Sequence, residues 1–134
     1  MENGVGSKMN TNQIKSFRDL NVWKEGHILV LEIYKITKTF PKDELFGLTN
    51  QIRRAAVSIT SNISEGFNRI SHKEKLQFYF IALGSLAETQ NQLLIAKDIG
   101  YIKQEVFDKI ELQLIVVQRL LNGFIKSTRI LQES

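Results

Sequence analysis

Apolar residues recur every three or four positions through almost all of the chain from Asp19 onwards, and the only proline is Pro41. This spacing places apolar side chains on one face of an α-helix, whereas a half-buried strand alternates apolar and polar residues. No segment follows the alternating pattern, so the sequence predicts an all-α protein. The breaks between the helical segments are short, which favours an antiparallel up-down-up-down four-helix bundle.

The polar start of the chain differs from the rest. Residues 1–16 are rich in Asn, Gly and Ser and lack apolar periodicity, so we expect a disordered N-terminal leader. The remaining residues, 17–134, are enough for one hydrophobic core and leave little room for a second. We therefore predict a single four-helix-bundle domain over residues 17–134.

Capping and stop signals set the expected helix boundaries. Asp19 is a plausible N-cap, and Pro41 disfavours helix at the residue before it. Gly66 and Gly100 stand where helices commonly stop, and Ser71 begins an S-x-x-E capping box. The predicted helices cover residues 19–40, 42–65, 71–98 and 103–131.

The chain contains no cysteine, which excludes disulfides, thiolate metal sites and cysteine nucleophiles. A chain without disulfides suits a reducing compartment, so we expect a cytoplasmic protein. No run reaches the roughly 18 consecutive apolar residues that a membrane span requires, and we expect no membrane partner.

Few residues suit catalysis. The two histidines, His27 and His72, both lack the glutamate three residues earlier that a di-metal helical bundle uses. We find no Gly-rich phosphate loop and no nucleophilic serine placed near a histidine. The sequence therefore predicts a non-enzymatic protein without catalytic residues, metal or cofactor.

The third and fourth predicted helices carry more apolar residues than one bundle core needs. Their apolar arcs are wider than the arc of an ordinary surface helix, which favours self-association. The alternative is that these residues are scattered surface aliphatics, which are common in monomers. The surplus positions are Leu76, Phe80, Leu83, Ala87 and Leu94 in the third helix and Leu112, Ile115, Val116 and Ile130 in the fourth.

The second predicted helix combines an apolar stripe with a polar edge. The expected core stripe consists of Leu48, Ile52, Ala55, Ala56, Ile59 and Ile63. The polar edge consists of Gln51, Arg54, Ser58, Asn62 and Glu65. We expect this edge to be a structural hydrogen-bonded seam between helices, with Arg53 on the other flank facing outwards.

A second interpretation assigns basic residues of this region to phosphate contacts. The chain has 18 basic and 14 acidic residues, a net charge of +4, and the basic excess gathers in two stretches. The candidate nucleic-acid contacts are Arg53, Arg69, Lys73, Lys75, Arg119, Lys126 and Arg129.

Three motifs extend the analysis beyond periodicity. They are DLxVW at residues 19–23, FPxxELFGLxxQIRRAAxSIxSNIxEG at residues 40–66, and FxxxALGSLAETQNQLLIAxxxGYI at residues 78–102. Together they resemble the four-helix-bundle proteins encoded in intervening sequences of bacterial 23S ribosomal RNA genes. That family is similar to the accessory variability proteins of diversity-generating retroelements.

The resemblance implies a homopentameric bundle without enzymatic activity. The accessory variability proteins assemble as basic pentameric barrels that bind nucleic acid and a reverse transcriptase. We therefore expect a homo-oligomer that binds RNA or DNA through a basic surface. The alternative is a protein-interaction scaffold that docks a partner such as a reverse transcriptase. The ribosomal label of the family reflects gene location and does not imply a ribosomal subunit.

Overall fold

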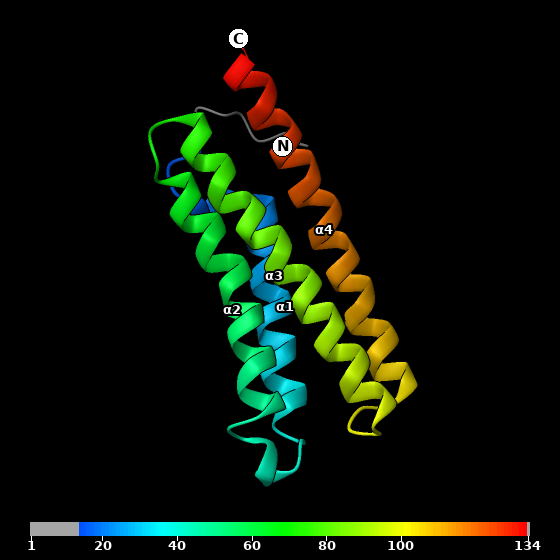
Figure 1. Cartoon of the computed structure of the whole chain (residues 1–134). Helices are drawn as coiled ribbons and strands as arrows, with labels where there is room; N and C mark the ends of the chain where they lie inside the picture. Colours follow the sequence, from blue (N-terminus) through cyan, green and yellow to red (C-terminus); the bar gives the residue numbers. More distant parts are fainter. Residues whose placement is uncertain (1–13, 134) are drawn as a thin grey trace.

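The computed structural model describes residues 14–133, which form four long α-helices. These are α1 (Asn21–Thr37), α2 (Leu48–Phe67), α3 (His72–Asp98) and α4 (Gln104–Glu133). Consecutive helices run in opposite directions, and each packs against two others, so that α4 returns to lie against α1 (Figure 1). Residues 14–133 contain no strand. The prediction of an all-α protein with four sequentially packed helices is confirmed.

The start of the packed region differs from the prediction. Residues 1–13 of the expected leader lie outside the described residues, but Ile14 packs against the core. Ser16 and Asp19 form a reciprocal capping box around a short 3-10 helix, η2 (Phe17–Asp19). Packing therefore begins by Ile14, within the predicted leader. Asp19 stabilises this turn instead of capping α1, whose N-cap, Leu20, makes no side-chain bond.

The helix α2 begins later than predicted, because residues Lys42–Glu44 form a separate 3-10 helix, η3. Gly47 then has φ −111° and ψ −115°, outside the helical region. The Glu44 side chain accepts a hydrogen bond from the Leu48 amide at 3.1 Å and so satisfies a donor at the start of α2. At the other end, α2 continues through Gly66 to Phe67, so Gly66 is not the predicted stop.

The predicted N-cap and the predicted C-terminal glycine of α3 are both confirmed. The Ser71 Oγ accepts a hydrogen bond from the Glu74 amide at 3.1 Å, as an N-cap should. Gly100 follows the helix with φ +90°, a conformation that favours glycine. Helix α1 ends at Thr37, before the predicted Phe40, because residues 37–40 form a tight turn.

The core runs along the bundle axis, and α2 supplies its centre. Ile52, Ala56, Ile59 and Ile63 have no exposed surface, which confirms the predicted stripe, although Leu48 is only half-buried. The expected surplus of apolar residues is partly on the surface. Leu76 is buried, whereas exposed residues on α3 and α4 include Phe80, Leu94, Leu112 and Val116. Within the described residues, no helix is long and apolar enough to span a membrane.

Candidate nucleic-acid interface

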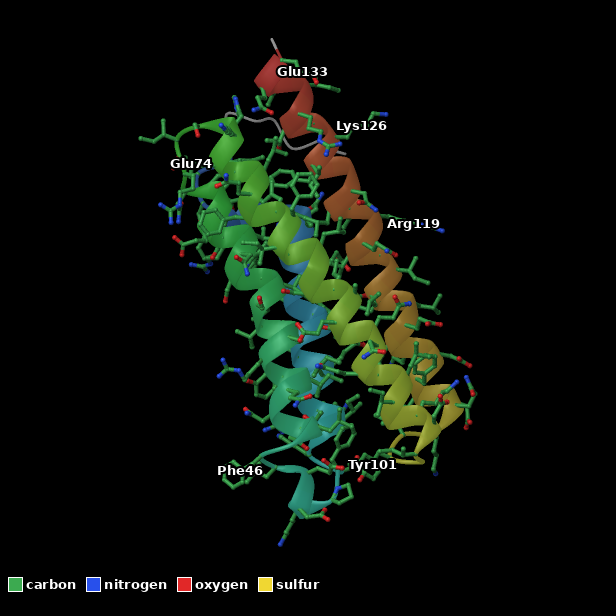
Figure 2. The ribbon with its side chains drawn as sticks, viewed as in Figure 1. Phe46, Glu74, Tyr101, Arg119, Lys126 and Glu133 are labelled. Atoms are coloured by element: carbon green, nitrogen blue, oxygen red, sulfur yellow. The ribbon has the colours of Figure 1, made fainter. Side chains whose placement is uncertain are left out.

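The antiparallel topology gathers most of the predicted contact residues at one end of the bundle. Arg69, Lys73 and Lys75 lie at the turn between α2 and α3, and the last turns of α4 carry Lys126 and Arg129. Figure 2 shows Lys126 near Glu133 at the upper end of α4, the same end as Glu74 in the first turn of α3. The Arg129 guanidinium lies over the Phe80 ring of α3, 5.0 Å from its centroid, which connects the two segments.

We call this region the basic end, because basic residues outnumber acidic ones there. Its basic residues are Lys15, Arg18, Arg69, Lys73, Lys75, Lys126 and Arg129, and its acidic residues are Asp19, Glu65, Glu74 and Glu133. At the opposite end the two signs are balanced, with Lys38, Lys42, Lys97 and Lys103 near Asp43, Glu44, Asp98 and Glu105. The net positive charge is therefore concentrated at one end.

Lys75 has a structural role that the sequence did not indicate. Its Nζ donates to the Phe67 carbonyl at 2.6 Å, one of the carbonyls at the C-terminus of α2 that have no partner within the helix. The ammonium also lies 5.3 Å from the centroid of the Phe67 ring, and burial lowers its pKa. Lys75 therefore caps α2, and we remove it from the candidate contacts.

The other cations of the basic end are more accessible. Arg69 pairs with Glu65 at 2.9 Å and lies over the Phe78 ring at 4.7 Å, so its charge is partly neutralised. Lys73 and Lys126 are exposed and make no ion pair with any described residue. Arg119 is also exposed but lies towards the middle of α4, away from the end (Figure 2). Lys73 and Lys126 are the residues best placed to meet a phosphate.

The two adjacent arginines of α2 have the reverse of their predicted placements. The Arg53 Nε donates to the buried Thr37 Oγ1 at 2.8 Å, and the guanidinium lies over the Tyr34 ring at 4.7 Å. Both partners come from α1, and Arg53 is half-buried. Arg54 is exposed between two shallow surface hollows, the second of which also borders Glu88. Arg53 is therefore part of the packing between α1 and α2, and Arg54 faces solvent.

Only the middle of the predicted polar seam joins two helices. The Ser85 hydroxyl of α3 donates to the Ser58 Oγ at 2.8 Å, and the Asn62 amide donates to the Ser58 carbonyl at 2.7 Å. Gln51 and Glu65 are exposed, and Glu65 pairs with Arg69 instead. Of these five residues, Ser58 makes the interhelical hydrogen bond, Asn62 bonds within α2, and Gln51, Arg54 and Glu65 are exposed.

Because Arg53 is packed against α1 and Arg54 faces solvent, the two arginines should contribute differently to the free energy of unfolding. We expect Arg53→Ala to lower the free energy of unfolding by about 2 kcal/mol, because it removes a hydrogen bond to a charged group and a cation–π contact. Arg54→Ala, the matched control at the next position, should change it by less than about 0.5 kcal/mol. Guanidinium unfolding measured by circular dichroism compares them, and a larger loss for Arg54→Ala would contradict the assignment.

A link between the two loops at the opposite end was missed. The Tyr101 hydroxyl donates to Glu44 Oε2 at 2.7 Å, across 57 positions of sequence. This bond, with the Leu48 amide bond to Oε1, lowers the pKa of the Glu44 carboxyl, and the pKa of Tyr101 is raised by the same hydrogen bond. The contact fixes the loop between α1 and α2 against the loop between α3 and α4.

No group of three or more His, Asp or Glu residues suited to metal binding occurs within residues 14–133.

Comparison with known proteins identifies one matching family and one similar crystal structure. A family model described as 23S rRNA-intervening sequence protein matches residues 18–123. A crystal structure of a protein of unknown function from the S23 ribosomal protein family of Bacteroides thetaiotaomicron is similar, with a TM-score of 0.73 and 25% sequence identity. The match covers 78% of this chain and 98% of that chain. No curated protein matches the chain.

Proposed function

Because the chain belongs to the 23S rRNA-intervening sequence protein family, we propose that it is a non-enzymatic bundle that self-assembles and binds RNA or DNA through its basic end. The observation that carries this proposal is that Lys73 on α3 and Lys126 on α4 lie at the same end of the bundle, both exposed and without ion pairs in the described part of the chain. Exposed cations that are not neutralised by acidic neighbours are what phosphate contacts require.

Self-assembly would multiply this modest charge. Exposed apolar residues occur on the outer faces of α3 and α4, including Ile81, Ile95 and Leu112, which are 52%, 42% and 66% exposed. Apolar surface of this kind supports association between copies. We propose a homopentamer, following the resemblance of the motifs to pentameric relatives. Repetition of the basic end around one particle would then raise its affinity for a polyanion through multivalency.

Binding at the basic end predicts a strong dependence on salt. We expect the protein to shift structured RNA or duplex DNA at low salt, with affinity falling steeply as salt rises. Lys73→Glu combined with Lys126→Glu should remove two phosphate contacts in each copy and lower the slope of log affinity against log salt by about 2 per bound copy. An electrophoretic shift or fluorescence anisotropy at several salt concentrations measures this.

The matched control makes the same charge change at the other end. Lys38→Glu combined with Arg54→Glu alters two exposed basic residues towards the end where the signs are balanced, and neither of them borders the cleft between α1 and α4. We expect a much smaller loss of binding, since only the overall charge is altered. Equal losses for the two double variants would show that the basic end is not the contact surface. If the unaltered protein binds neither nucleic acid at low salt, the proposal is wrong.

A protein-interaction scaffold is the second candidate. It is favoured by Ile70, which is 97% exposed in the turn between α2 and α3, beside the basic end. A large aliphatic side chain at a turn is unfavourable in water unless another molecule covers it. Co-purification from the host after nuclease treatment separates the two functions. A scaffold would retain a protein partner, such as a reverse transcriptase, after the nucleic acid is digested. A partner that is held only through bridging nucleic acid would be lost.

A further inference from the structure

A cleft separates α1 from α4 at the end of the bundle opposite the basic end. It has a volume of about 830 Å³ and is bordered by the second half of α1, the loop between α3 and α4, and the first turns of α4. Its apolar wall includes Ile36, Val106 and Ile110, and its rim carries charged residues. Val106 is 37% exposed, so the wall is open to another molecule.

One acidic atom in this cleft lacks a partner. The Glu32 Oε1 is buried, and no hydrogen-bond donor among the described residues reaches it. Burial raises the pKa of this carboxyl, against the opposite influence of Lys109 and Lys35. A buried carboxylate oxygen without a donor is costly, and a donor from another molecule would relieve the cost.

The same end of the bundle presents an aromatic side chain to solvent. Phe46, in the loop between α1 and α2, is 90% exposed. The loop is held in place, because the Gly47 amide donates to the Glu44 carbonyl at 2.9 Å and the Glu44 carboxylate accepts from Tyr101. The exposure of Phe46 therefore belongs to a fixed loop. Lys42 and Asp43, on the same loop, are also exposed.

The aromatic side chain and the cleft lie on opposite sides of α1. Helix α1 packs between α2 and α4, so the loop that leads into α2 and the cleft between α1 and α4 flank it on different sides. Figure 2 shows Phe46 extending from the left of this end, with Tyr101, which borders the cleft, to its right. Phe46 is thus directed away from the cleft of its own chain.

We propose that Phe46 of one copy inserts into the cleft between α1 and α4 of a second copy, where Lys42 of the inserting loop reaches Glu32. This inference rests on the self-assembly proposed above. The insertion removes an exposed ring from water against Ile36, Val106 and Ile110. Asp43 of the same loop then faces the lysines of the cleft rim, Lys103 and Lys109, so the charges of the two surfaces are complementary. A contact between two different surfaces is heterologous, and its repetition generates a ring when the rotation between successive copies closes.

Two serine variants test the inserting residue. Phe46→Ser should raise the dissociation constant of the assembly at least about 30-fold, as expected for a residue central to an interface. Ile70→Ser, the control, removes an equally exposed aliphatic side chain at the other end and should leave the assembly intact. Light scattering after gel filtration, over a range of concentrations, measures the mass. Circular dichroism melts confirm that both variants are folded.

A mixing experiment tests the cleft. Val106→Arg should block the cleft and also yield monomers, while keeping Phe46 available. Because Phe46→Ser keeps an open cleft, an equimolar mixture of the two variants should form dimers that cannot grow further. This outcome is specific to a head-to-tail contact. A mixture that stays monomeric would overturn the inference.

The masses of the unaltered protein and of the two serine variants distinguish a failure of the Phe46 insertion from a failure of self-assembly. If the unaltered protein is monomeric at micromolar concentration, both the proposed assembly and the insertion are wrong. If it is oligomeric and Phe46→Ser has the same mass, the insertion is wrong while self-assembly stands. If Ile70→Ser dissociates the assembly as strongly as Phe46→Ser, the interface is not at the loop between α1 and α2.

Discussion

Gly66→Ala is expected to lower the free energy of unfolding by about 3 kcal/mol, through overpacking at the contact between α2 and α3. A Cβ atom at this position would lie 2.6 Å from Tyr79 Cε1 and 2.9 Å from Phe78 Cβ. Tyr79 is 1% exposed and packs against the Phe124 ring of α4, with 4.8 Å between the ring centroids. Because the tyrosine is enclosed on both sides, it cannot move away without disturbing α4. Chemical unfolding measures the loss.

Gly123→Ala provides the matched control for this substitution. Gly123 is also a helical glycine, but a Cβ atom there would have no heavy atom within 4 Å outside its own helix turn. The substitution should therefore raise the free energy of unfolding by about 1 kcal/mol, the difference in helix propensity between the two residues. A similar gain for Gly66→Ala would show that α2 and α3 are less closely packed than described.

The second large effect is expected from Leu121→Ala, at the centre of α4. Leu121 has no exposed surface and belongs to the main core cluster. Removal of its side chain costs both the transfer free energy of the lost carbons and the cavity that remains, together about 3 kcal/mol. A lower midpoint of guanidinium unfolding, with an unchanged slope, is the expected measurement.

The same helix supplies a control with the same chemical change. Leu112 is 66% exposed, so Leu112→Ala should alter the free energy of unfolding by less than about 0.5 kcal/mol. Any change in mass caused by this variant is read separately by light scattering, because it would report on contacts between copies. If the two leucine variants were equally destabilised, the assignment of the buried face of α4 would be wrong.

The fold was predictable because its determinants are local or periodic. The Ser71 cap and the Gly100 stop act within a few residues, and the apolar period of α2 identified Ile52, Ala56 and Ile59 as core. The exceptions also have local causes. Asp19 is engaged by Ser16, and Lys42–Glu44 forms its own turn, so two helices begin later than the sequence indicated.

The candidate interface was less predictable, because availability of a charge depends on its neighbours. Sequence identified the basic residues, but it could not show that Lys75 caps the carbonyls of α2 while Lys73, two positions earlier, stays exposed. It also missed the bond between Tyr101 and Glu44, whose partners are distant in the chain. Helix direction alone brings Lys73 and Lys126 to the same end.

By itself the sequence determined the number of helices, their approximate limits, the core of α2 and the family, because periodicity, capping chemistry and motifs are properties of neighbouring residues. Only the tertiary structure decided which side chains remain available for binding. Arg53 and Arg54 point about 100° apart on an ideal helix, and the residue pattern indicated the wrong one of them as the outward-facing arginine. The crossing of α1 places Thr37 and Tyr34 beside Arg53 and leaves Arg54 in solvent. Such a choice depends on how whole helices pack, which no local pattern encodes.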